Sequence, residues 1–160
     1  MRTELIKQAA ATLAFASATF LASSVAYSHG DVTPQAVDTS GLKQLGTEIA
    51  KENPYRGNKK AIAVGDSAYN QNCARCHGLE AVSGGIAPDL RKLDQDCDGL
   101  AAKDKQAACR KEVDDYFMVS VLRGKVRDGA VYMPPFEGIL QQEAIWAIKA
   151  YVEERSPTLK

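Results

Sequence analysis

The sequence predicts an all-α protein, because three of its segments carry apolar residues at the spacing of a helix. The clearest is QQEAIWAIKAYVEE, from Gln141 to Glu154, and the second is EVDDYFMVSVLRG, from Glu112 to Gly124. A shorter pattern precedes Asn53-Pro54, which predicts the end of a helix there. The candidate core residues of the three segments are Leu42, Leu45 and Ile49; Val113, Tyr116, Phe117, Val121 and Leu122; and Ile145, Ile148 and Val152.

Length and composition indicate an ordinary globular protein with one domain and some extra segments. The 160 residues are 45% hydrophobic and 25% charged, as is usual for such a protein. Twenty Lys and Arg residues balance 20 Asp and Glu residues. This balance gives no field that would attract nucleic acid, so we expect no nucleic-acid partner.

The first 28 residues have the features of a signal peptide. Arg2 and Lys7 precede an uncharged stretch rich in Ala, Ser and Thr, which ends in the small-residue pattern Ala26-Tyr27-Ser28. A retained membrane anchor is the alternative, but the strongly apolar part is shorter than the roughly 20 residues that a spanning helix needs. We therefore expect cleavage before His29, no stable membrane insertion afterwards, and a periplasmic location.

Residues 29–60 form an N-terminal extension, which we expect to pack against the rest of the protein. Contact with a partner is the alternative role, and His29 could serve as an N-terminal copper ligand. The shorter helical pattern described above lies within this extension.

An exported protein seldom keeps free thiols, so we expect each of the four cysteines to be bonded covalently or to a metal ion. They form two pairs in the sequence, Cys73 with Cys76 and Cys97 with Cys109. We expect a Cys97–Cys109 disulfide that closes a solvated insertion over residues 94–111. A ring of this size stabilises by roughly 3 kcal/mol on the loop-entropy model.

The first pair lies in Cys73-x-x-Cys76-His77, which has three possible functions. A structural zinc site needs four ligands, and neither the second cysteine pair nor the remaining histidine has the spacing to complete one. A thiol–disulfide motif would follow a strand, whereas AVGDSAYNQN shows no alternating pattern. Covalent haem attachment needs two thiols for the porphyrin vinyl groups and a histidine directly after them. The motif therefore predicts one covalent haem c with His77 as the proximal ligand.

The second axial ligand is predicted to be Met133. It lies in RDGAVYMPPFEG, which we expect to be a loop bracketed by glycines, where Pro134 and Pro135 restrict the backbone and can hold a thioether rigidly. Met118 lies among the candidate core residues of a helix and is better explained as a core side chain. His29 or an open iron position are the remaining alternatives. Histidine and methionine together would raise the reduction potential and leave no site for substrate, which favours electron transfer.

These motifs resemble a class I cytochrome c over roughly residues 61–154. The matching residues are Gly65, Tyr69, Cys73, Cys76, His77, Pro88, Met133 with Pro134, and Trp146. The resemblance implies that an N-terminal and a C-terminal helix cross at Gly65, with Tyr69 and Trp146 packed nearby. It also implies that the carbonyl of Pro88 accepts a hydrogen bond from His77. The cytochrome c domain would then occupy residues 61–160, and Arg91 is a candidate contact for a haem propionate.

Longer stretches resemble the PedF-like cytochrome c-550 family. They are HGDVTPQAVDTSGL, NPYR, AYNQNCARCHGLEAVSGGIAPDLRKLD and GKVRDGAVYMPPFEGILQQEAIWAI. This resemblance implies an electron carrier whose donor is a periplasmic PQQ-dependent alcohol dehydrogenase. We expect a monomer that passes its electrons to a terminal oxidase or another cytochrome. Two alternatives remain open: a haem enzyme or gas sensor with an open sixth position, and a permanent subunit of a membrane complex.

The insertion also contains Asp94-x-Asp96-x-Asp98-Gly99, which begins like a calcium-binding loop. The twelfth position of such a loop should carry an acidic ligand, but it is Lys105 here. An EF-hand is therefore not expected, although weaker calcium binding by the three aspartates remains an alternative.

Overall fold

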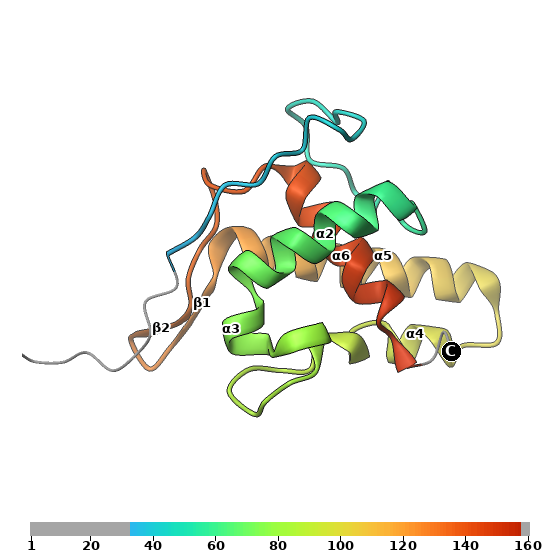
Figure 1. Ribbon diagram of the computed structural model, residues 1–160. Helices are drawn as coiled ribbons and strands as arrows, with labels where there is room; N and C mark the ends of the chain where they lie inside the picture. Colours follow the sequence, from blue (N-terminus) through green and yellow to red (C-terminus); the bar gives the residue numbers. More distant parts are fainter. Residues whose placement is uncertain (1–32, 158–160) are drawn as a thin grey trace, which may run out of the picture. The chain divides into compact units, whose positions relative to one another are not determined.

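The computed structural model describes residues 33–157, so the predicted signal peptide and His29 lie outside the described residues. Helices make up most of the regular secondary structure of the described residues, which confirms the predicted fold class (Figure 1). The elements are α2 (Lys59–Asn72), α3 (Ala74–His77), η2 (Leu79–Ala81), η3 (Leu90–Lys92), α4 (Gln95–Asp98), α5 (Lys103–Arg123), β1 (Lys125–Arg127), β2 (Ala130–Met133) and α6 (Gln142–Glu154). The antiparallel pair β1–β2 was not predicted. Within the described range, no helix is both long and apolar enough to cross a membrane.

Helices α2 and α6 cross at Gly65, as the resemblance implies (Figure 1). Helix α2 begins after Asn58, whose side chain accepts hydrogen bonds from the N–H groups of Lys60 and Ala61. A Cβ atom placed on Gly65 would lie 2.0 Å from the carbonyl oxygen of Ala147 in α6. The missing side chain therefore allows the two helix backbones to touch.

We expect Gly65→Ala to destabilise the protein by about 2–4 kcal/mol, because the new methyl group would force α6 away from α2. Helix propensity alone predicts the opposite, a gain of roughly 1 kcal/mol. Urea unfolding followed by circular dichroism shows whether the substitution lowers or raises the free energy of unfolding. Gly84→Ala is the control, since nothing lies within 4 Å of a Cβ atom there. A stabilised Gly65→Ala variant would show that the helices do not touch at this position.

Helix α6 is buried on nearly all sides rather than along one stripe. Ile145, Ile148 and Val152 are buried as predicted, but so are Lys149 and Glu153. The sequence pattern underestimated this burial because charged residues interrupt it. A helix surrounded in this way is the centre of the core.

Helix α5 contributes fewer residues to the core than predicted. Phe117 and Val121 are buried as expected, and Met118 is a core side chain with 3% of its surface exposed. Tyr116, predicted to be in the core, is 57% exposed, and the ammonium of Lys125 lies 4.4 Å from the centre of its ring. The two remaining candidates, Val113 and Leu122, are half-buried.

The N-terminal extension packs against the core, but its predicted helix at residues 42–49 is absent. Leu42 joins the hydrophobic core, whereas Ile49 is 48% exposed. Backbone N–H groups of this segment bond to side chains of α6 instead of to one another: that of Leu45 donates to Glu143 at 2.7 Å and that of Ala50 to Gln142 at 3.0 Å. These contacts replace the hydrogen bonds of a helix and explain the incorrect prediction.

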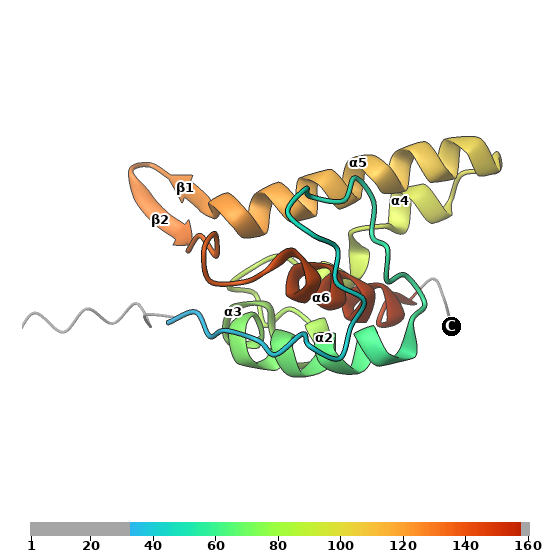
Figure 2. The same cartoon turned by 90° about the horizontal axis from the view of Figure 1, so that it is seen from above.

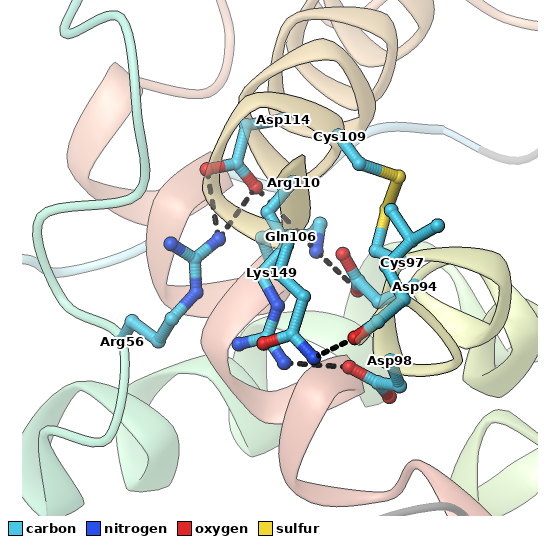
Figure 3. The surroundings of a disulfide bond; sticks show 10 residues. Arg56, Asp94, Cys97, Asp98, Gln106, Cys109, Arg110, Asp114 and Lys149 are labelled. Carbon is cyan, nitrogen blue, oxygen red and sulfur yellow. Dashed lines mark hydrogen bonds and ion pairs between the residues drawn. A yellow bond between two sulfur atoms is a disulfide. The ribbon is translucent and has the colours of Figure 1, made fainter. Parts of the chain in front are cut away.

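The predicted Cys97–Cys109 disulfide is present and joins α4 to α5 (Figure 3). The insertion is not simply solvated, because Cys97 and Asp94 are both buried. Asp94 bonds to Lys149 at 2.6 Å, and Asp98 bonds to Arg110 at 2.5 Å. Two of the three aspartates considered for calcium are therefore paired with cations of the chain itself. The described residues contain no cluster of acidic, cysteine and histidine side chains that could hold a metal ion.

Five charged residues from four segments form a largely buried network beside the disulfide, and Figure 3 labels all of them except Glu153. Its members are Arg56 of the extension, Asp94, Asp114 of α5, and Lys149 and Glu153 of α6. The Lys149 side chain is fully buried, with its Nζ 2.6 Å from Glu153 and 3.5 Å from Asp114. Burial raises the pKa of Asp94, although Lys149 opposes that effect. Nothing in the sequence pattern predicted this network.

Candidate functional site

Helix α3 is a single turn that contains Cys76 and His77, with Cys73 directly before it. The N–H groups of both Cys76 and His77 donate to the carbonyl of Cys73, at 3.1 Å and 2.9 Å. This turn brings the three predicted attachment residues together. Gly78 then ends the turn with φ of +83°, and a Cβ atom there would lie 1.8 Å from the carbonyl oxygen of Val82. The carbonyl of Gly78 also accepts a hydrogen bond from the hydroxyl of Tyr69 at 2.7 Å.

The thiol of Cys73 does not have the properties of the nucleophile of a thiol–disulfide exchange site. Cys73 and Cys76 are the two cysteines of the described chain that are not joined in a disulfide. Burial and the neighbouring Cys76 raise the pKa of Cys73 to about 12. Exchange motifs need a lowered thiol pKa, because the thiolate is the nucleophile.

The imidazole of His77 is oriented by the carbonyl of Pro88, as the resemblance implies. Its Nδ1 lies 2.9 Å from that oxygen, so Nδ1 carries the proton of the neutral ring and Nε2 is the nitrogen left to bind a metal. Burial lowers the pKa of His77, and the hydrogen bond to Pro88 opposes that effect. The neutral ring that burial favours is the form that binds iron.

Met133 is the last residue of β2 rather than part of an irregular loop. Strands β1 and β2 are joined through Asp128 and Gly129, which have φ of +51° and +78°. Two positive values of φ are typical of the tight turn that favours an Asp-Gly pair. Met133 is half-buried against the core, whereas Met118 lies inside it. In both views the hairpin and α3 lie at the same end of the described region (Figures 1 and 2).

Exposed apolar residues flank both predicted ligand segments. Ten large hydrophobic residues of the described chain are exposed, and six of them lie in residues 79–86 or 126–132. These six are Leu79, Val82, Ile86, Val126, Val131 and Tyr132. Apolar side chains that stay exposed on two segments next to the predicted ligands make these segments a candidate binding surface. With two unpaired thiols and an oriented imidazole beside it, this surface suits an apolar macrocycle such as haem.

Arg91, the candidate for a propionate contact, forms an ion pair with Asp89 at 2.7 Å. Asp89 also caps the start of η3, where its side chain accepts a hydrogen bond from the N–H of Arg91. The structure thus supplies a partner for this guanidinium within the chain.

Comparisons with known proteins agree with this site. Residues 60–152 match the family model described as cytochrome c oxidase, cbb3-type, subunit III. The chain is 53% identical to a cytochrome c550 of Pseudomonas aeruginosa over 135 residues, which cover 82% of this chain and 83% of that protein. No solved structure matches.

Two quinohemoprotein alcohol dehydrogenases of Pseudomonas putida are also similar. ADH-IIG is 32% identical over 99 residues, and ADH IIB is 30% identical over 102 residues. These matches cover 62% and 64% of this chain but 11% and 12% of the two dehydrogenases.

Both the family model and the cytochrome c550 relative extend over most of the described chain, including the turn with Cys73, Cys76 and His77. These relationships show an electron carrier, so an enzymatic role is not supported. The chain therefore belongs to the c-type cytochromes: it carries covalently bound haem c and transfers electrons.

Proposed function

We propose that the chain accepts electrons one at a time from a periplasmic, PQQ-dependent alcohol dehydrogenase and delivers them to the respiratory chain. The observation that carries the choice of donor is the similarity to part of two quinohemoprotein alcohol dehydrogenases. In those proteins the similar segment belongs to the same polypeptide as the rest of the enzyme. A dehydrogenase that lacks such a segment would instead pass its electrons to a separate cytochrome such as this chain.

The site residues have the following proposed roles. Cys73 and Cys76 form the thioether bonds to haem, while His77 and Met133 are the two axial ligands. The haem iron supplies the one-electron redox chemistry. The thioether of Met133 favours the ferrous state and so raises the reduction potential. Arg91 remains the candidate propionate contact, in competition with Asp89.

The apolar residues of segments 79–86 and 126–132 would exclude water from the macrocycle, and two protein ligands would exclude substrate from the iron. We propose a monomer in the periplasm, released after removal of residues 1–28. A carrier must leave its partner after each transfer, so its interface with donor or acceptor should bury less than about 1,200 Å² in total. The acceptor in this proposal is a terminal oxidase or another cytochrome.

Anaerobic stopped-flow mixing tests the donor. The oxidised holoprotein is mixed with a purified quinoprotein ethanol dehydrogenase and ethanol, and the haem spectrum is followed. We expect fast reduction that saturates with enzyme concentration and requires both enzyme and ethanol.

Two controls separate the possible failures of this experiment. Dithionite must reduce the haem, and the dehydrogenase must be active on an artificial acceptor. If both controls succeed and ethanol still causes negligible reduction, the chain is an electron carrier with another donor.

A further inference from the structure

Gly124 connects the end of α5 to β1 in a conformation that is almost restricted to glycine. Its φ is +66° and its ψ is −165°. A Cβ atom placed on it would lie 2.3 Å from the carbonyl oxygen of Met133 and 2.8 Å from backbone atoms of Pro134 and Pro135. The backbone around Met133 thus rests directly on the α-carbon of Gly124.

The same segment is fixed on its other sides by backbone pairing. Met133 is the register partner of Lys125 in the hairpin. Beyond the prolines, the N–H of Phe136 donates to the carbonyl of Val121 at 3.0 Å, and that of Glu137 donates to Leu122 at 3.2 Å. Pro134 and Pro135 have no N–H to donate, so their contact with Gly124 is steric. A side chain at position 124 would therefore displace the segment rather than rearrange its hydrogen bonds.

We propose that Gly124 is a positioning residue for the distal ligand: the absent side chain lets the backbone of Met133 reach the end of α5 and sets where its thioether lies. This inference rests on the proposed function, in which Met133 binds the haem iron. Metal–ligand distances tolerate changes of only a few tenths of an ångström, so a displacement of the Met133 backbone by a methyl group weakens or breaks the bond. The effect on the iron is transmitted entirely through Met133.

The test compares Gly124→Ala with Gly138→Ala in the haem-loaded protein. Gly138 has a similar φ of +76°, but nothing lies within 4 Å of a Cβ atom there. Both variants place an alanine at a positive φ, and only Gly124→Ala gains the clash with Met133. We expect only Gly124→Ala to lower the reduction potential, to weaken the sulfur-to-iron charge-transfer band of the ferric protein and to speed cyanide binding.

Met133→Leu provides the reference that separates this inference from the proposed ligand. If Met133→Leu lowers the potential and Gly124→Ala leaves it at the wild-type value, the positioning role is wrong but the ligand is right. If Met133→Leu itself changes nothing, the ligand assignment fails, and the positioning role fails with it.

A second variant covers the case in which Gly124→Ala does not fold. Gly124→Asn also carries a Cβ atom, and asparagine is several-fold enriched among non-glycine residues at positive φ. It should shift the potential in the same direction as Met133→Leu. If neither Gly124 variant yields folded holoprotein while Gly138→Ala does, Gly124 acts in folding alone and the proposal is overturned.

Discussion

Replacing Met133 by leucine should lower the reduction potential of the haem by on the order of 0.1 V or more, because axial ligands tune haem potentials over about 0.8 V. Leucine keeps the volume of methionine but has no sulfur to bind the iron, so the ferrous state loses its stabilising ligand. The vacant position should also bind cyanide rapidly in the ferric protein. A spectroelectrochemical titration measures the potential, and stopped-flow absorption measures cyanide binding.

Met118→Leu is the matched control for this prediction, since the same chemical change is made at a buried core position. It should cost less than about 1.5 kcal/mol of stability and leave the potential and spectrum unchanged. If Met118→Leu lowers the potential and Met133→Leu does not, the distal ligand is Met118. Such a result would require a rearrangement of α5, because only 3% of the Met118 surface is exposed.

Features that only a few residue types can form were predictable from the sequence. The turn that contains Cys73, Cys76 and His77 follows from the spacing of three residues. The crossing at Gly65 and the contact between His77 and Pro88 came from a family resemblance, and the structure contains both. In each case a local geometry allows few residue types.

The hairpin that presents Met133 was missed although its signal is in the sequence. Asp128-Gly129 is a strong indicator of a two-residue hairpin turn when β-favouring residues flank it. The flanking strands are only three and four residues long and largely exposed, so they show no burial pattern. The prolines that follow Met133 favour a loop, whereas pairing of the two strands places Met133 at the end of β2.

The charge network could not be predicted for a different reason. Its members include Arg56, Asp114 and Lys149, which are far apart in the sequence. Each is of a residue type that usually lies on the surface. Only the packing of the extension and α5 against α6 brings them together. Most charged residues are exposed, so the default assignment for each was the surface.

The disulfide and the network act on the same part of the fold. The Cys97–Cys109 bond joins α4 to α5, and Asp94, directly before α4, contacts Lys149 of α6 (Figure 3). Arg56 links the N-terminal extension to the same group through Asp114 and Glu153. Lys149 and Arg56 therefore link both the insertion and the extension to the core, in addition to the disulfide and the backbone contacts described above.

Lys149→Met should destabilise the holoprotein by about 3–5 kcal/mol, the usual cost of removing one member of a buried charge pair. Methionine can fill much of the space of the lysine stem, so loss of packing is a minor part of the effect. The main cost is that three buried carboxylates are left with Arg56 as their remaining cation. Guanidinium unfolding at neutral pH measures the loss. Lys111→Met, an exposed change in α5, should fall within about 0.5 kcal/mol of the wild type.

Stability measurements at low pH, together with a second substitution, distinguish the loss of charge from the loss of packing at Lys149. Burial raises the pKa of Asp94, and a carboxyl whose pKa is higher in the folded state binds its proton more tightly there. Loss of the ammonium group raises that pKa further, so the difference between Lys149→Met and the wild type should shrink as the pH falls. Asp94→Asn should likewise rescue part of the loss when combined with Lys149→Met, because the two groups interact at 2.6 Å. Strictly additive effects at every pH would mean that Lys149 contributes through packing and that its charge is neutral to stability.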